Sequence, residues 1–285
     1  MMKFLVTIIL LLFSVNAYAE EVQVELGGEE DARAYETLDS LVYLYQPYIT
    51  NISAYEPIYF LVGTDPEKSK FQYSFKYRFV DKDGWAAKNQ SWLAGLHFGY
   101  TQTSYWNLKD DSLPFEDTSY KPEIFHLSRN IGARPSWMQG FFVQTGFRHE
   151  SNGQAEPLSR STNIFYVRPV FVLYSAKSKL GIAVSPKVWA YIDNSEKNPD
   201  LEDYRGYFQL DLALGKADSL VLISNWRWAK EGGSVQADLS YPVGDYLSEN
   251  INIYLHFQYV NALAESLLNY QDRTEAFRIG FSFIR

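Results

Sequence analysis

Three residues of this sequence are spaced so that they can form a nucleophilic centre. His149 and Ser151 lie in the stretch 147–153, which reads FRHESNG, and Asn163 follows. A serine becomes a nucleophile when a histidine within hydrogen-bond reach takes its proton and a third group holds the imidazole in one tautomer. We therefore expect Ser151 to be the nucleophile, His149 the general base and Asn163 the orienting group. The backbone N–H groups around Ser151 and Gly153 are candidates for an oxyanion hole.

The pattern around these residues is that of two β-strands. Side chains alternate between the two faces of a strand, so residues two apart share a face. His149 and Ser151 therefore share the face that carries Phe141, Val143 and Phe147, and in the returning segment Asn163 shares a face with Phe165. If the segments pair as a hairpin with Phe147 opposite Phe165, His149 faces Asn163, with Cβ atoms about 5 Å apart. The three polar side chains then converge on an apolar surface.

The N-terminus predicts export. Lys3 precedes an apolar run over 4–15, and Ala17-Tyr18-Ala19 has the small-x-small pattern of a cleavage site. We expect residues 1–19 to be a signal peptide. The alternative is a membrane anchor helix, but the run is shorter than the about 20 residues that span a bilayer. We expect 20–55, which begins with an acidic cluster, to be a periplasmic segment with limited structure, and 56–285 to be the main domain.

Composition favours a membrane β-barrel. The chain has 22 Tyr, 19 Phe and 7 Trp, yet no second segment resembles a membrane-spanning apolar helix. In a membrane barrel alternate residues face lipid, and aromatic side chains mark both interfaces. A net charge of -8 argues against nucleic-acid binding, and the absence of cysteine shows that the fold needs no disulfide.

Period-two alternation recurs along the chain, at lengths suited to tilted membrane strands. The sequence predicts an all-β fold, a single antiparallel transmembrane β-barrel of about twelve strands in the outer membrane. The strands are expected near 57–63, 70–80, 91–104, 121–130, 137–150, 162–174, 179–192, 204–215, 218–228, 232–242, 250–260 and 272–284. With both termini periplasmic, the long connections around 110–120, 151–161 and 193–203 are extracellular. His149 and Ser151 then lie at the outer leaflet.

The motif residues resemble those of the outer membrane phospholipase A family. Its pattern His-x-Ser-Asn-Gly, followed by Ser-Arg-Ser-x-Asn, is matched by residues 149–153 and 159–163. Further similar stretches are YTQTSYW at 100–106, SLPF at 112–115, NPD at 198–200 and GYFQL at 206–210. The resemblance implies a twelve-stranded barrel that hydrolyses acyl esters of phospholipids and lysophospholipids, as a calcium-dependent serine hydrolase of the A1/A2 type. It also implies a resting monomer and an active homodimer.

The resemblance implies a calcium site and a dimer contact. The calcium ligands would be Ser159 and Gln154, the latter through its backbone carbonyl where the family usually has arginine, with Ser112 from the partner chain. A further site on the loop near Asp193 maps poorly, because Lys197 falls on its acidic position, and Glu196 is the nearest substitute. Gln102 shares a face with Tyr100 and Phe98. Its amide either lies near the membrane interface and meets water or forms a dimer contact, and the resemblance supports the dimer contact.

Two other function classes compete with a phospholipase. A lipid A deacylase is another outer-membrane serine hydrolase with a His-x-Ser arrangement, but that family has eight strands and a carboxylate as its third member. A passive porin-like barrel gives no reason for polar residues on an apolar stripe. The sequence leaves open the acyl-chain and headgroup preference, the position of the ester that is cleaved, and the trigger of activation.

Overall fold

The computed structural model of the chain describes residues 51–194, 196–244 and 252–285. Its strands are β1 (Ile52–Ala54), β2 (Ile58–Gly63), β3 (Ser69–Arg78), β4 (Leu96–Trp106), β5 (Phe115–Leu127), β6 (Gly140–Ser151), β7 (Ser161–Ser175), β8 (Leu180–Asn194), β9 (Phe208–Gly215), β10 (Val221–Ala229), β11 (Gly232–Pro242), β12 (Tyr254–Leu263) and β13 (Arg273–Ile284). The helices are α3 (Trp85–Asn89), α4 (Leu201–Arg205) and the 3₁₀ turns η2 (Pro66–Lys68) and η3 (Ser91–Gly95). The predicted signal peptide and most of the predicted segment 20–55 lie outside the described residues.

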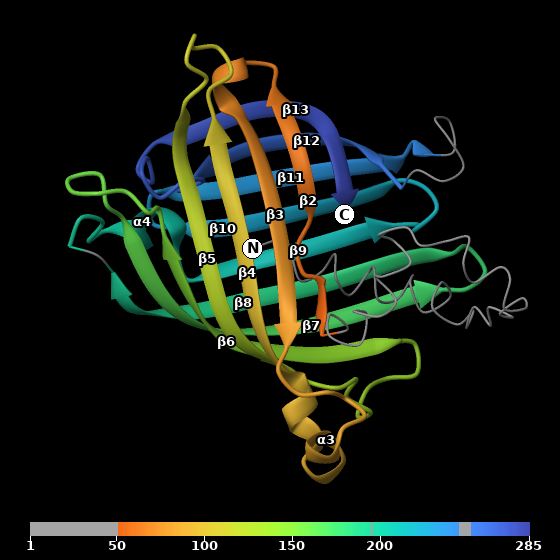
Figure 1. Cartoon of the computed structure of the whole chain (residues 1–285). Coiled ribbons are helices and arrows are strands. Elements are labelled where there is room, and N and C mark those ends of the chain that lie inside the picture. Colours follow the sequence, from red (N-terminus) through yellow and green to blue (C-terminus); the bar gives the residue numbers. More distant parts are fainter. Residues whose placement is uncertain (1–50, 195, 245–251) are drawn as a thin grey trace, which may run out of the picture.

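Strands β2 to β13 form one closed antiparallel barrel (Figure 1). Each strand pairs with its sequence neighbours, β13 pairs with β2, and the β3–β4 ladder completes the circle. Short β1 adds to β3 beyond the end of β2. Closure leaves no free sheet edge, which is the condition for strands to cross lipid. The predicted twelve-stranded antiparallel barrel is confirmed.

Helices α3 and α4 lie at opposite ends of the barrel (Figure 1). We call the end at which β4, β6 and β8 finish the α4 end, and the other the α3 end. The predicted loops around 110–120, 151–161 and 193–203 belong to the α4 end, although 115–120 is strand rather than loop. At the α3 end, β7–β8 and β9–β10 have short connections, as predicted, whereas the β3–β4 connection is long and contains α3 and η3.

Several predicted boundaries were wrong at strand ends. Residues 91–95 form η3 instead of the start of a strand, and Phe115 to Tyr120 extend β5 because they pair with the end of β4. The strand expected at 204–215 begins at Phe208, after α4. These differences arise because a backbone segment joins a ladder when a neighbouring strand offers hydrogen bonds, whatever its own side-chain pattern.

The two faces of the barrel wall differ in chemistry. Large apolar side chains are exposed on the outside, among them Phe60, Ile124, Phe147, Phe165, Leu222, Leu239, Phe257 and Phe277. An apolar exterior of this kind is the lipid-facing surface of a membrane barrel. The predicted outward parity is confirmed along β6, where the even-numbered residues from Gln144 to Glu150 are buried and the odd-numbered ones from Phe141 to Ser151 are not.

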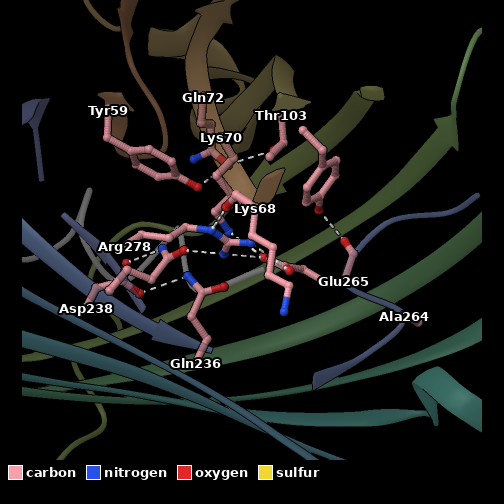
Figure 2. Close-up of polar contacts among 12 residues, drawn as sticks. Tyr59, Lys68, Lys70, Gln72, Thr103, Gln236, Asp238, Ala264, Glu265 and Arg278 are labelled. Carbon is pink, nitrogen blue, oxygen red and sulfur yellow. Dashed lines mark hydrogen bonds and ion pairs between the residues drawn. The ribbon is translucent and has the colours of Figure 1, made fainter. Parts of the chain in front are cut away.

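The side chains that project into the lumen are largely charged or polar, and they pair with one another. The lumen therefore does not have apolar walls. Glu123 accepts from Arg148 at 2.8 Å and from the Tyr166 hydroxyl at 2.6 Å. Figure 2 shows a second cluster, in which Lys70 and Arg278 both converge on Glu265, at 2.9 and 2.7 Å. Buried charges persist where they are paired in this way. The first cluster links β5, β6 and β7, and the second links β3 and β13 to the β12–β13 loop.

Candidate active site

The hairpin β6–β7 brings His149 and Asn163 into direct contact. The two residues are opposite one another in the ladder, as are Phe147 and Phe165, so the register predicted from the sequence is confirmed. The Nδ1 atom of His149 lies 2.9 Å from Oδ1 of Asn163. Because an amide oxygen accepts, Nδ1–H is the donor, and Nε2 is left as the acceptor. This is the tautomer that a general base for a serine requires.

Ser151 is the last residue of β6 and lies on the same outward face, two residues beyond His149. It is partly exposed, and its neighbours across the sheet are Tyr120 of β5 and Ser161 of β7. Within the described part of the chain, its hydroxyl makes no hydrogen bond to the His149 ring. Side chains two apart on a strand can close such a gap by rotation, and catalytic hydrogen bonds often tighten when substrate binds.

The opposite face of β6 is fixed in the lumen. Arg148 pairs with Glu123, and Glu150 accepts from Arg205 of α4 at 2.8 Å and from Ser119 of β5 at 3.0 Å. Each residue that flanks His149 in sequence is therefore held by charged or hydroxyl partners inside the barrel. Since backbone motion at His149 or Ser151 would break these bonds, the lumenal contacts hold the outward side chains in position.

The loop after Ser151 is organised by Asn152. This buried side chain donates to the Leu158 carbonyl at 2.9 Å and accepts from the Arg160 backbone N–H at 2.9 Å. Gly153 follows in the left-handed region, with φ of +67°. A Cβ at Gly153 would meet Cε2 of Tyr120 at 2.7 Å. The tight turn keeps the backbone N–H groups that we expect to form the oxyanion hole next to Ser151.

The surroundings of the three residues are apolar. Phe147 and Phe165 precede and follow them on the outward face, with 42% and 48% of their surface exposed. A lipid chain, rather than water, is the natural neighbour of such side chains. A molecule that reaches Ser151 from this side must pass along an apolar surface.

The residues expected to bind calcium lie at the same end of the barrel. Gln154 and Ser159 belong to the β6–β7 loop, and exposed Ser112 lies in the β4–β5 loop. Glu196 is an exposed turn residue, and near it Lys197 pairs with Glu156 at 3.3 Å. Oxygen donors of this kind suit calcium, which takes six to eight oxygens. Among the described residues, no cluster of three or more acidic, histidine or cysteine side chains suits a metal.

Gln102 faces outward from β4, as expected from its parity. Its amide oxygen accepts from the hydroxyls of Tyr73, at 2.5 Å, and Tyr100, at 2.9 Å. Its amide nitrogen makes one long contact, 3.4 Å, to the Ser104 hydroxyl. The oxygen is thus satisfied within the chain, while the amide N–H groups retain donor capacity toward a neighbour.

Sequence reasoning missed Tyr120, Glu150 and Arg205 as parts of this site. Tyr120 borders Ser151 and Gly153 because β5 pairs with β6 in that register. Arg205 arrives from a short helix in a different loop. Glu150 could have been found from the sequence. Its parity places it on the inward face, and an inward-facing carboxylate in a barrel needs a cationic partner.

The other histidines are remote from the site. His97 and His256 are buried in the lumen, where His256 contacts Asp238 at 2.8 Å and His97 contacts the Gly95 carbonyl at 2.8 Å. His126 lies on the outward face, with its ring 3.1 Å from the Trp92 carbonyl. All three rings therefore contact other residues of the chain.

Comparison with known protein families identifies the chain. The family model described as phospholipase A1 matches residues 30–283. The chain belongs to the phospholipase A1 family. Among curated relatives, the phospholipase A1 of Escherichia coli K12 is 31% identical over 178 residues, and that of Salmonella typhimurium LT2 is 33% identical over 179. Each alignment covers 61% of this chain and 57% of the relative, so the chain spans somewhat more than half the length of these relatives.

Solved structures support the fold of this family member. The outer membrane phospholipase A of Escherichia coli superposes with a TM-score of 0.66 at 23% identity, covering 83% of this chain and 95% of that one. The Salmonella typhi outer membrane phospholipase, a dimer with bound calcium, gives 0.66 at 24% identity, covering 81% and 91%. At these identities the likeness concerns the barrel. Of the helices in the described ranges, none is long and apolar enough to span a bilayer.

Proposed function

We propose that the chain is an outer-membrane phospholipase that hydrolyses acyl esters of phospholipids and lysophospholipids with Ser151, His149 and Asn163. The observation that supports this most directly is the 2.9 Å contact between His149 and Asn163 on the same outward face as Ser151. Membership of the phospholipase A1 family supports the substrate class. The active site would lie at the outer leaflet of the outer membrane of a Gram-negative bacterium.

The proposed chemistry proceeds through an acyl-enzyme. Ser151 Oγ attacks the ester carbonyl carbon while His149 Nε2 takes its proton, and Asn163 holds the resulting imidazolium through Nδ1–H. Backbone N–H groups at Ser151 and Gly153 stabilise the oxyanion. His149 then protonates the glycerol oxygen as the ester bond breaks, and water, deprotonated by His149, releases the fatty acid. Asn163 carries no charge, so it stabilises the imidazolium less than an aspartate would.

Calcium and a second chain would complete the site. Ser159 and the Gln154 carbonyl from one chain, with Ser112 from its partner, would hold the ion, and Glu196 is a weaker candidate ligand. Bound there, calcium would add positive charge close to the developing oxyanion. We further propose a monomeric resting state and an active homodimer that packs through the face carrying Gln102. The calcium-bound dimer of the Salmonella typhi relative supports calcium binding and dimerisation.

The two alternatives have less support. A lipid A deacylase of the kind considered above has eight strands and a carboxylate in the third position, whereas this barrel has twelve and an asparagine. A passive porin is disfavoured by the buried ion pairs that nearby strands and the β12–β13 loop place in the lumen. A passive barrel also gives no role to the His149–Asn163 contact on the outward face.

A substrate panel tests the proposal. Purified full-length protein would be assayed on a phosphatidylcholine, on a lysophospholipid and on lipid A, each with calcium and with chelator. The Ser151→Ala variant is the control for contaminating hydrolases, and its loss of activity should be on the order of 10⁴-fold or more. We expect calcium-dependent release of fatty acid from the first two substrates. Cleavage of lipid A alone would support the deacylase, and no cleavage of any substrate would support a passive barrel.

A further inference from the structure

A cavity lies within the part of the lumen that is nearest to the α4 end. Its volume is about 120 Å³, and its walls come from β2 to β12, from α4 and from the β12–β13 loop. We call it the lumenal cavity and define it by Lys70, Arg148, Glu150, Arg205, Arg227 and Glu265, all of which line it. A water molecule needs only about 10–15 Å³ of such space. The cavity therefore has room for a small polyatomic ligand with water around it.

The charges that line this cavity do not balance. Five cationic side chains and two carboxylates form its walls. Glu265 is shared between Lys70 and Arg278, and Glu150 is engaged by Arg205; Figure 2 shows the first of these arrangements. Arg148 is compensated from outside the lining by Glu123, at 2.8 Å, and by Glu56, at 3.8 Å, and Lys121 acts on Glu150. More positive charge than negative charge thus remains around the space, and an anion within it would be attracted.

Arg227 is the clearest source of this excess. Its guanidinium donates to the backbone carbonyls of Leu263, at 2.6 Å, and Ala264, at 3.5 Å. Within the described ranges, no carboxylate lies within ion-pair distance of it. Carbonyl oxygens satisfy two donor directions of an arginine without neutralising its charge. An uncompensated guanidinium in the wall of a barrel lumen is costly unless a counter-charge is present.

Unpaired hydrogen-bond donors point to the same conclusion. The Nε atoms of Arg148 and Arg205 are buried and make no hydrogen bond in the described structure. Arg148 as a whole is 6% exposed. Leaving a buried donor without an acceptor costs about 1–3 kcal/mol. Because both orphaned groups are donors on residues that line the cavity, the missing partner must accept hydrogen bonds.

We propose that the lumenal cavity binds a small inorganic oxyanion of the phosphate class. A tetrahedral oxyanion has several acceptor oxygens and can bridge guanidinium groups that approach from different sides, as here from β6, α4 and β10. Bound there, it would link Arg205 of α4 to the inner face of β6, behind His149 and Ser151. The anion would bind inside the folded barrel, so this proposal does not depend on the proposed hydrolytic activity.

Thermal unfolding in the presence of inorganic phosphate tests the proposal. Full-length protein in a neutral detergent would be equilibrated with sodium phosphate, and with sodium chloride at equal ionic strength to separate binding from screening. A ligand that binds the folded state raises Tm with the logarithm of its concentration. We expect phosphate to raise Tm by several degrees more than chloride does. Arg227→Gln should abolish this difference, whereas Lys179→Gln, in the β7–β8 turn, should preserve it.

A second pair of variants keeps the test informative if Arg227→Gln fails to fold. Ala262 lines the cavity next to Leu263, whose carbonyl holds Arg227. Ala262→Glu supplies a tethered carboxylate and should raise Tm without phosphate while removing the phosphate response. Ala262→Gln has the same size without the charge and should not raise Tm. An equal Tm for the two variants, or equal effects of phosphate and chloride on the wild type, would overturn the proposal.

Crystallography with a heavy-atom analogue of phosphate tests the proposed site directly. A crystal soaked in tungstate, an electron-rich phosphate analogue, should show anomalous density within the lumenal cavity, in contact with Arg227. Density there in wild type and none in Arg227→Gln supports a specific site. A cavity that contains only water at high tungstate concentration would exclude it.

Discussion

The contact between His149 and Asn163 defines what each residue of the proposed triad can contribute. The hydrogen bond fixes the imidazole so that Nε2 is free to accept a proton. An amide orients the ring as a carboxylate does, but it supplies no negative charge to stabilise an imidazolium. Orientation and charge stabilisation are therefore separable in this site, and substitutions at the two residues should have unequal effects.

We predict that Asn163→Ala lowers turnover less than His149→Ala does. The histidine transfers the proton, whereas the asparagine only holds the ring, so its loss leaves a base that is present but poorly oriented. Asn163→Asp is the matched variant, because it keeps the acceptor and adds charge, and it should restore much of the turnover. Initial rates on a phospholipid, with heat-modifiable migration as the folding check, measure this. Equal inactivity of Asn163→Ala and His149→Ala, with Asn163→Ala unfolded, would make Asn163 structural.

Among the elements, the loop that follows β6 controls the backbone donors beside Ser151. Asn152 anchors this loop to Leu158 and Arg160, and Gly153 turns it at positive φ against the ring of Tyr120. A residue with a Cβ is strained in that conformation and also meets the Tyr120 ring. The turn thus requires glycine for two independent reasons.

We predict that Gly153→Ala lowers turnover by up to about 100-fold, because displacement of catalytic groups by about 1 Å has effects of that size. The Michaelis constant should change little, since the substituted residue is not part of the apolar binding surface. Gly132→Ala is the matched control, because a Cβ at Gly132 meets no atom within 4 Å. Steady-state kinetics on both variants decide the point. Wild-type turnover in Gly153→Ala would show that the turn does not position catalytic groups.

Helix α4 and the β12–β13 loop pack together at the α4 end of the barrel. Leu201, Leu267 and Tyr270 pack together there as a small buried cluster. The Tyr270 hydroxyl donates to Asp200, and Gln271 donates to the same carboxylate at 3.0 Å. The hydrogen bond from Tyr270 lowers the pKa of Asp200 below its ordinary value.

We predict that this contact weakens in acid. A carboxyl group whose pKa is lower in the folded state contributes stability above its ordinary pKa of about 3.9, and that contribution is lost as pH falls through the lower, folded-state pKa. Protection of 264–272 against hydrogen exchange, corrected for the intrinsic pH dependence of the exchange rate, should therefore fall below about pH 4. Asp200→Asn should exchange faster at neutral pH and lose most of this acid dependence, whereas Asp111→Asn in the β4–β5 loop should behave as wild type. An unchanged acid response in Asp200→Asn would contradict this explanation.

For the whole molecule, the position of Ser151 on the outer wall sets the problem of substrate access. In a single barrel, Phe147 and Phe165 beside the proposed site are exposed on the outward surface. A second barrel on that face would enclose an acyl chain and bring Ser112 toward Ser159 and Gln154. A ligand that binds the dimer better than the monomer shifts the equilibrium toward the dimer, and the linkage is reciprocal.

We predict that calcium and activity are coupled through dimerisation. In detergent with chelator the protein should be largely monomeric and inactive, and calcium with substrate or with an acyl-forming inhibitor should produce dimers and turnover together. Gln102→Ala should shift both curves to higher calcium, and Asn261→Ala, on the outward side of β12, should shift neither. Cross-linking and hydrolysis would be measured in one calcium titration. Full turnover by a protein held monomeric would exclude a shared site while leaving the serine chemistry intact.

The alternation of outward and inward side chains along the barrel wall could be predicted from the amino-acid sequence. So could the pairing of His149 with Asn163. Both depend on the period of two along a strand and on a hairpin between neighbours in the chain, which are local properties. The number of strands was predictable for the same reason. The motif residues around Ser151 and Asn163 were enough to indicate the family.

The surroundings of that pair depend on the tertiary structure. The place of Tyr120 beside Ser151 depends on the register between β5 and β6, and the bond from Arg205 to Glu150 depends on how the β8–β9 loop folds back over the lumen. The lumenal cavity is formed by residues far apart in the sequence, and its excess of positive charge emerges only when their partners are known. Barrel closure brings these residues together, and no local pattern encodes which side chains then meet across the lumen.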